Sequence, residues 1–267
     1  MSVLTASLPR GRMPILGLGT WRMTGMACVS AVKKALDLGY RHIDTAEFYQ
    51  NETETGRAVR ASGVKRDEVF LTSKVWGDHF RHDDLVAACE ASLKRLGTDY
   101  LDLYLLHYYE DSVPLDETLR AMKKLLDEGK IRNAGVSNFN EKQLQEAIEL
   151  ADFKIAVNQV EFHPYLFQKE LLDFCTKNNV HATAYCPVGR GVILNDPVLN
   201  QIAKHKKKTV AQVSLRWLLQ HGLSVIPKAS KEKHMRENMD VFEWALHGEE
   251  MNRIDCLGVK KRLVPLG

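Results

Sequence analysis

The chain is short of cysteine, of long hydrophobic runs and of net charge, and each shortage excludes a class of protein. Its five cysteines are widely scattered, with no Cys-x-x-Cys pair and no nearby histidine at metal-ligand spacing. We therefore expect a reduced, cytoplasmic protein without a bound metal. No segment approaches the roughly 20 consecutive apolar residues of a membrane helix, and residues 1–15 lack the apolar run of a signal peptide.

The net charge of +3 is too small to indicate a nucleic acid as a partner. The one basic run, residues 204–208, has no interleaved aromatic side chains for base stacking and is typical of a solvated helix end.

Two further absences concern architecture. No Gly-x-Gly-x-x-Gly follows a predicted strand, which disfavours a doubly wound sheet. No Ser- or Pro-rich linker divides the chain, so we expect one domain over residues 1–267.

What the chain does contain is a repeated unit of apolar strand, polar loop and amphipathic helix. Its 267 residues, 45% hydrophobic and 27% charged, suit a globular α/β barrel, which commonly has about 250 residues. Strands are expected at residues 15–21, 41–44, 69–74, 100–107, 131–137, 156–161, 181–185 and 223–227. Helices are expected at 29–38, 52–61, 83–96, 115–128, 141–150, 168–177, 210–220 and 249–257, with an additional one at 198–205. This alternation predicts a (β/α)8 TIM barrel.

Polar side chains stand at the C-terminal ends of the predicted strands. Asp44, Lys74 and His107 end the second, third and fourth strands. At or just past the ends of the next four strands are Ser137, Asn138, Gln159, Glu161, Tyr185 and Lys228. Because the active site of a TIM barrel is built at the C-terminal face of its strands, these side chains are the candidates for chemistry.

Four of these side chains suit proton transfer. A buried Lys74 needs a partner, and Asp44 on the neighbouring strand supplies one. Tyr49, on the loop after Asp44, can reach the same ammonium, which would lower the phenol pKa from about 10 and make Tyr49 a proton donor. A neutral His107 opposite the phenol could orient a carbonyl oxygen. From the residues alone, a structural ion pair and a core histidine remain alternatives.

Five ordered segments resemble the signatures of the aldo-keto reductase family, and the similarity spans nearly the whole chain. The first is residues 39–46 with Glu52 and Gly56, and the later ones are 105–107, 135–139, 158–161 and 226–228. The chain stops soon after its last helical pattern, without the long C-terminal loop that closes over bulky substrates in other members. It is therefore similar to the short prokaryotic branch that includes 2,5-diketo-gluconate reductases.

The resemblance implies that Tyr49 is the general acid, that Lys74, paired with Asp44, lowers its pKa, and that His107 orients the carbonyl. It implies NADPH as the cofactor, held by Thr20, Ser137, Asn138, Gln159, Tyr185, Pro187, Val188, Gly189, Arg190, Lys228, Ala229, Ser230, His234, Glu237 and Asn238. Within this set, residues 137, 138 and 159 would bind the nicotinamide carboxamide and Tyr185 would stack beneath the ring. Residues 185–191 resemble the pyrophosphate loop, residues 228–230 would lie near the 2'-phosphate, and residues 237–238 would hold the adenine. An aromatic substrate pocket would be formed by Trp21, Phe48, Trp76 and Tyr108.

After His107 the family often shows Trp-Pro, where this chain has Tyr108 and Tyr109. Two other departures from the family pattern concern the cofactor. His234 stands where an arginine is usual, and a largely neutral imidazole cannot clamp a phosphate with two hydrogen bonds. Arg236 is no substitute, because residues two apart on a helix do not share a face. We therefore expect relaxed discrimination against NADH. Cys186 stands where a serine is usual, and its thiol is a weak donor that favours a packing role.

These observations predict an NADPH-dependent reductase of small aldehydes, dicarbonyls or sugar-derived ketones, acting as a monomer. Two alternatives come from other classes of protein. Lys74 could be the Schiff-base nucleophile of a lyase, which borohydride trapping on that residue would reveal. The chain could also be a nicotinamide-binding regulatory protein similar to potassium-channel β subunits, which would bind the cofactor tightly without turning it over.

Overall fold

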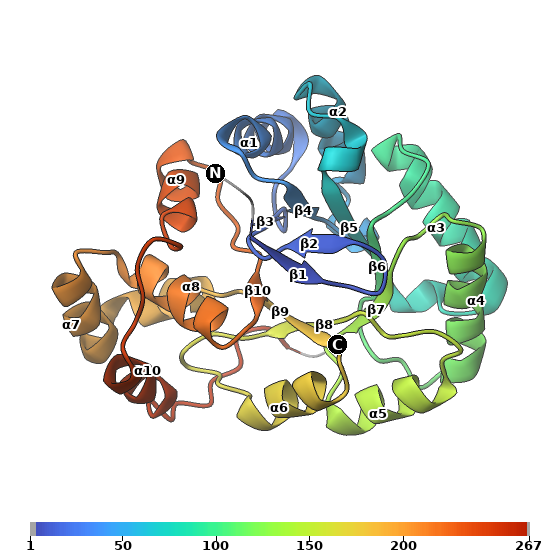
Figure 1. Ribbon diagram of the computed structural model, residues 1–267. Coiled ribbons are helices and arrows are strands. Elements are labelled where there is room, and N and C mark those ends of the chain that lie inside the picture. Colours follow the sequence, from blue (N-terminus) through green and yellow to red (C-terminus); the bar gives the residue numbers. More distant parts are fainter. Residues whose placement is uncertain (1–3, 266–267) are drawn as a thin grey trace.

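The computed structural model describes residues 4–265, which form an eight-stranded parallel sheet curled into a barrel (Figure 1). The strands follow one another in chain order: β3 Leu18–Gly19, β4 His42–Asp44, β5 Phe70–Val75, β6 Leu103–Leu106, β7 Ala134–Ser137, β8 Val157–Glu161, β9 His181–Tyr185 and β10 Ser224–Val225. The first and last strands also meet, because the Gly17 N–H donates to Val225 O at 2.9 Å and the Val225 N–H donates to Ile15 O at 2.8 Å. The predicted (β/α)8 barrel is confirmed.

Helices surround the barrel (Figure 1). They are α1 Gly25–Leu38, α2 Glu52–Ala61, α3 His82–Leu96, α4 Leu115–Asp127, α5 Glu141–Leu150, α6 Lys169–Lys177, α7 Pro197–Lys206, α8 Val210–Gln220, α9 Glu232–Met239 and α10 Gly248–Asp255. The additional helix predicted after the seventh strand is α7. α5 and α8 each begin with a capping box, which pairs backbone N–H groups that the first turn leaves unbonded. Within residues 4–265, no helix has the length and apolar character needed to span a bilayer.

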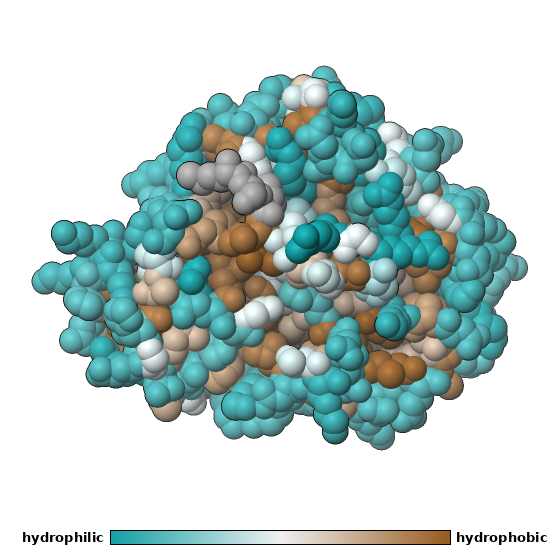
Figure 2. Space-filling model, viewed as in Figure 1, coloured by the Kyte–Doolittle hydropathy of each residue, from teal (hydrophilic) through white to brown (hydrophobic). Residues whose placement is uncertain are grey.

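A short antiparallel hairpin covers the N-terminal end of the barrel. Its strands, β1 Thr5–Ser7 and β2 Arg12–Pro14, lie across the front of the sheet in Figure 1. The fully buried Met13 packs against Phe70 and Val157, at the starts of β5 and β8. Beside the hairpin, the face in Figure 2 carries an apolar groove lined in part by Leu4, Leu16, Leu38, Met239 and Phe242. The polar strand ends lie at the opposite end of the barrel.

The two terminal strands of the sheet are shorter than predicted. Extended segments were expected at residues 15–21 and 223–227, but regular pairing covers only Leu18–Gly19 and Ser224–Val225. Glycine weakens a strand interior, and Pro227 has no N–H with which to continue the ladder. The pairing continues as single contacts, such as the Gly19 N–H donating to Pro227 O at 3.3 Å.

Candidate active site

Three neighbouring strands carry the central side chains to the C-terminal end of the barrel. β4 ends on Asp44, Lys74 is the penultimate residue of β5, and His107 follows β6 directly. The register pairs Asp44 with Thr72 and Lys74 with Leu105, so the three side chains lie at similar heights along the barrel. The structure thus brings these predicted residues together.

Asp44 and Lys74 form a buried ion pair. The Lys74 Nζ donates to Asp44 Oδ1 at 2.6 Å, and the two residues are 0% and 1% exposed, respectively. Nζ also donates to Thr45 O at 2.8 Å and to the Tyr49 hydroxyl at 3.3 Å. The second carboxylate oxygen of Asp44 accepts from Gln159 Nε2 at 2.8 Å. All three ammonium hydrogens and both carboxylate oxygens are therefore engaged, which a buried charge pair requires.

Tyr49 ends a single 3-10 turn, Glu47–Tyr49, on the loop between β4 and α2. Because Lys74 can only donate to its oxygen, the phenol hydrogen is free to point elsewhere. Burial raises the pKa of Tyr49 well above its ordinary value, and the Asp44 carboxylate adds to the increase. The lowered pKa expected from the sequence is wrong, because burial of the phenol and the Asp44 carboxylate together outweigh the effect of the Lys74 charge. Tyr49 therefore holds its proton, as a general acid must before reaction.

His107 is neutral. Its side chain is buried, and Nδ1 has no hydrogen-bond partner among residues 4–265. Burial, reinforced by the Lys74 charge, lowers the pKa of His107 well below its ordinary value. Its ring lies edge-on to Tyr49, with 5.6 Å between the ring centroids. A neutral imidazole beside a protonated phenol suits a site that binds an uncharged oxygen such as that of a carbonyl.

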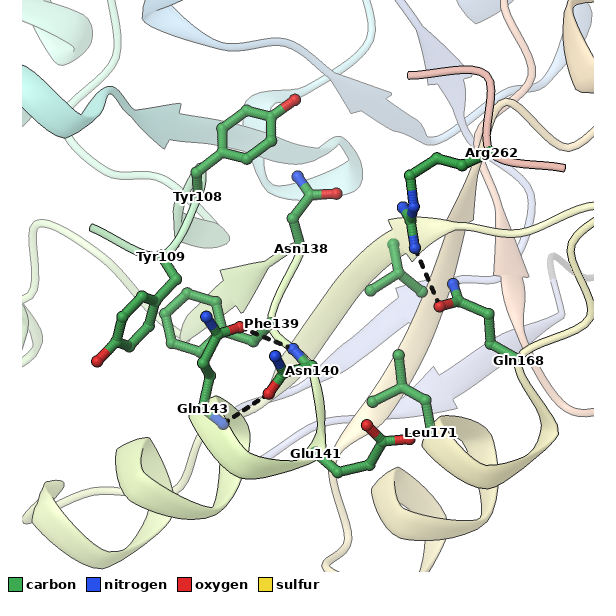
Figure 3. Close-up of a pocket in the computed structure, with 11 residues that line it drawn as sticks. Tyr108, Tyr109, Asn138, Phe139, Asn140, Glu141, Gln143, Gln168, Leu171 and Arg262 are labelled. Carbon is green, nitrogen blue, oxygen red and sulfur yellow. Dashed lines mark hydrogen bonds between the residues drawn. The ribbon is translucent and has the colours of Figure 1, made fainter. Parts of the chain in front are cut away.

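The four predicted pocket residues form one aromatic wall around this pair. Phe48 stacks on Trp76 with 4.1 Å between centroids and on Trp21 with 5.8 Å. Tyr108 stacks on His107 at 5.2 Å and meets Trp76 edge-on at 5.5 Å. The wall is continuous with the catalytic candidates, and Tyr108 also faces a cavity beside Asn138 (Figure 3).

Amide and hydroxyl groups gather where β7, β8 and β9 end. The Ser137 hydroxyl donates to Gln159 O at 2.8 Å, and Asn138 Nδ2 donates to His107 O at 3.0 Å. The Tyr185 hydroxyl donates to Asn138 Oδ1 at 2.7 Å, which fixes the orientation of its half-buried ring. Gln159 Oε1 accepts no hydrogen bond from residues 4–265, so it remains available to a ligand N–H.

The loop after β9 has the backbone of an anion-binding turn. Left-handed φ angles occur at Cys186, Gly189, Arg190 and Gly191. Runs of such residues form concave loops whose N–H groups bind anions. The Ser214 hydroxyl donates to Pro187 O at 2.5 Å and ties the loop to α8, and Val188 is partly buried beside it. Burial raises the pKa of the Cys186 thiol, so it is neutral.

The predicted 2'-phosphate residues lie after β10. Lys228 and Ser230 are exposed, and Ala229 is buried between them. In the described part of the chain, neither Lys228 nor Arg190 is paired with a carboxylate. His234 Nδ1 lies 3.0 Å from Glu237 Oε2, while Asn238 is only 6% exposed.

Arg236 does not reach this group. Its guanidinium donates to Glu232 Oε1 at 2.7 Å, one turn back along α9, and it lines the apolar groove at the opposite end of the barrel. The structure therefore supports the expectation that Arg236 does not replace the arginine missing at position 234.

Sequence reasoning missed Asn51 as an organising residue. Its Nδ2 donates to Thr20 O and Met23 O, each at 2.9 Å, and its Oδ1 accepts from the Thr45 hydroxyl at 2.7 Å. The fully buried Thr20 hydroxyl donates to Asp44 O at 3.0 Å, so Thr20 supports the strand end. Asn51 directly precedes Glu52 of the first signature segment, and this position is the sequence signal that could have marked it as important.

The site and the fold match known proteins. The profile of the aldo/keto reductase family matches residues 15–258. The chain belongs to the aldo/keto reductase family. It is 46% identical to the glyoxal reductase of Bacillus subtilis (strain 168) over 263 residues, covering 98% of this chain and 95% of that protein. It is 43% identical to the 9,11-endoperoxide prostaglandin H2 reductase of Trypanosoma cruzi (strain CL Brener), covering 94% of this chain and 90% of the relative.

Solved structures agree with this assignment to the aldo/keto reductases. One provisionally described as a 2,5-diketo-D-gluconic acid reductase B superposes with a TM-score of 0.92 at 42% identity, covering 95% of this chain and 92% of that one. The aldo/keto reductase of Brucella melitensis gives a TM-score of 0.91 at 40% identity, covering 95% and 99%. The predicted family and its likeness to 2,5-diketo-gluconate reductases are confirmed, and the chain is a member of an oxidoreductase family that reduces carbonyl groups.

Proposed function

We propose that this protein reduces small aldehydes, dicarbonyls or sugar-derived ketones to alcohols with NADPH, and that Tyr49 donates the proton. The proposal depends on one observation: a protonated phenol, a neutral imidazole and a buried ammonium lie together at the C-terminal end of the barrel strands. The Lys74 Nζ lies 3.3 Å from the Tyr49 hydroxyl oxygen. The likeness to a glyoxal reductase supports dicarbonyls as substrates.

The residues present fit a nicotinamide cofactor, which when bound supplies the hydride. Gln159 Oε1, Ser137 and Asn138 would hold the carboxamide, and the Tyr185 ring, fixed by Asn138, would support the nicotinamide. The left-handed loop at 186–191 would bind the pyrophosphate, and the exposed Lys228 would bind the 2'-phosphate.

The chain's own groups then act on the carbonyl oxygen. Tyr49 and His107 orient that oxygen, and Tyr49 gives it a proton as negative charge develops. Lys74 stabilises the phenolate that this leaves, because the ammonium already lies against the phenol oxygen. Lys74 and His107 are buried, and removal from water strengthens each of these interactions.

The deciding experiment replaces Tyr49 with Phe. We expect kcat for methylglyoxal reduction to fall by at least about 100-fold, the usual contribution of a positioned acid, while NADPH binding measured by fluorescence is retained. Tyr100→Phe is the matched control, because the Tyr100 hydroxyl is buried and has no hydrogen-bond partner among residues 4–265. A Tyr49→Phe enzyme that keeps most of its activity would overturn the role of Tyr49.

Two other functions are tested alongside. All three hydrogens of the Lys74 ammonium are occupied and its partner Asp44 is buried, which disfavours a free amine nucleophile. Borohydride trapping of a carbonyl compound on Lys74, with no nicotinamide consumed, would favour the lyase instead. Tight NADPH binding with no turnover of any carbonyl would favour the regulatory protein.

A further inference from the structure

A buried carboxylate holds a C-terminal segment, residues 261–264, against the C-terminal end of the barrel strands. The C-terminal segment, residues 261–264, has no regular secondary structure. The backbone N–H groups of Leu263 and Val264 donate to the two oxygens of Glu161 at 2.7 and 3.0 Å. A third bond, from the Lys261 N–H to Tyr165 O at 2.6 Å, secures the start of the segment.

Glu161 is built for this contact. It is the last residue of β8, its side chain is 0% exposed, and His163 Nε2 lies 3.0 Å from Oε1. Burial alone would raise the pKa of Glu161, but hydrogen bonds from His163 and from the two backbone amides outweigh it and lower the pKa. Glu161 is therefore a buried carboxylate whose charge is stabilised in large part by the C-terminal segment.

The segment also contacts the proposed substrate and cofactor regions. The Leu263 side chain lies against the left-handed loop, since a Cβ built on Gly189 would come within 3.5 Å of Leu263 Cδ1. Arg262 and Tyr108 line the same cavity, and Arg262 donates to Gln168 Oε1 at 3.2 Å (Figure 3). Arg262 NH1 lies 3.8 Å from Glu161 Oε2. One short segment thus borders both the cavity that Tyr108 lines and the left-handed loop at residues 186–191.

We propose that Glu161 is a positioning residue that holds the C-terminal segment in place as a wall shared by the carbonyl pocket and the cofactor loop. The inference rests on the proposed reductase function. Among residues 4–265, Glu161 forms no hydrogen bond with Asp44, Tyr49, Lys74 or His107. It therefore acts on binding of the carbonyl substrate and of NADPH, and the proton transfer itself does not depend on it.

The test combines Glu161→Gln with a chain that ends at Lys260. Glutamine places an NH2 group where one carboxylate oxygen accepted a backbone N–H. One of the two hydrogen bonds to the segment is then lost, because two donors face each other there. We expect the KM for methylglyoxal and the Kd for NADPH to rise about tenfold, typical of coupling between sites, while kcat changes less. Backbone amides 263 and 264 should exchange faster with deuterium.

The control is Glu250→Gln, because Glu250 is also buried and accepts a backbone N–H, from His247 at 2.8 Å, but contacts α7 and α10 instead of the segment. It should change neither KM nor Kd. In the chain ending at Lys260, Glu161→Gln should have no additional effect on KM.

Three results would overturn the proposal: additive effects of the mutation and the truncation, a loss of kcat with KM unchanged, or unaltered exchange at residues 263 and 264. Exchange and NADPH binding need no turnover. An enzyme that reduced no carbonyl would therefore defeat the proposed function and still leave the role of Glu161 measurable.

Discussion

At the scale of single residues, the Tyr49 environment shows why a catalytic pKa cannot be taken from one neighbour. Lys74 alone would favour phenolate, but Asp44 lies on the other side of the ammonium and the phenol is partly removed from water. The opposite charges of Lys74 and Asp44 largely cancel in their effect on the pKa of Tyr49. The loss of hydration on burial therefore decides the direction of the shift, which is upward. In the proposed mechanism the ammonium stabilises the negative charge that develops on the phenol oxygen as the proton leaves, which places its contribution in the transition state.

Residue 234 is where a single side chain should set cofactor preference. His234 is exposed and its Nδ1 lies 3.0 Å from a carboxylate oxygen of Glu237, so the imidazole cannot offer a 2'-phosphate the paired hydrogen bonds of a guanidinium. We expect the natural enzyme to use both cofactors, with a preference for NADPH below about a thousandfold in kcat/KM, or about 4 kcal/mol. His234→Arg should raise that preference about tenfold, mainly through the KM for NADPH, because a guanidinium binds phosphate with two hydrogen bonds.

Initial rates with both cofactors, using methylglyoxal and an aromatic aldehyde, measure this preference. His205→Arg is the matched control, since it makes the same change of charge at an exposed site on α7, away from the proposed cofactor residues. Equal shifts in the two variants would mean that overall charge, and no local contact, governs cofactor choice.

At the scale of elements, the hairpin β1–β2 contributes stability and the opposite end of the barrel contributes chemistry. Met13 is 0% exposed and fills the space between the starts of the strands. Met13→Ala should lower the free energy of unfolding by about 2–5 kcal/mol, the usual cost of such a cavity, without changing kcat. Met26→Ala, which makes the same replacement at a side chain that is 62% exposed, should change it by less than about 0.5 kcal/mol. Urea denaturation measures both, and a loss of kcat in Met13→Ala would show that the two ends are coupled.

The elements that could be predicted are those with a local signal. Asp44, Lys74 and His107 each stand within one residue of the end of an apolar strand, and the common direction of parallel strands places such ends together. The hairpin was not predicted, because Gly11 and two prolines interrupt any alternation in that region. Nor was the role of Glu161, since its partner Leu263 lies 102 residues away and such a hydrogen bond leaves no periodic pattern. Local periodicity indicates which face of an element is buried, but it does not indicate which distant backbone N–H group will donate a hydrogen bond to a buried carboxylate.

At the scale of the whole molecule, the barrel is closed by its two shortest strands. β3 and β10 have two residues each. The first and last segments of the sheet are joined by single backbone hydrogen bonds, such as those from Gly17 to Val225 and from Gly19 to Pro227. Closure depends on close approach of the backbones, which glycine permits. A Cβ on Gly19 would lie 2.7 Å from Ile226 O, a backbone atom that can move only if the strand moves.

Gly19→Ala should therefore weaken the closed barrel as a unit. We expect a loss of about 1–3 kcal/mol in the free energy of unfolding, the cost of overpacking a dense interior. Because Lys228 follows Ile226 by two residues, a displaced strand should also raise the KM for NADPH. Gly248→Ala is the control, since among residues 4–265 the added Cβ would meet no atom within 4 Å beyond its chain neighbours and its own helix backbone. If the urea midpoints of the two variants coincide, β10 can shift at no cost. The contact between β3 and β10 would then limit neither the stability of the barrel nor the position of Lys228.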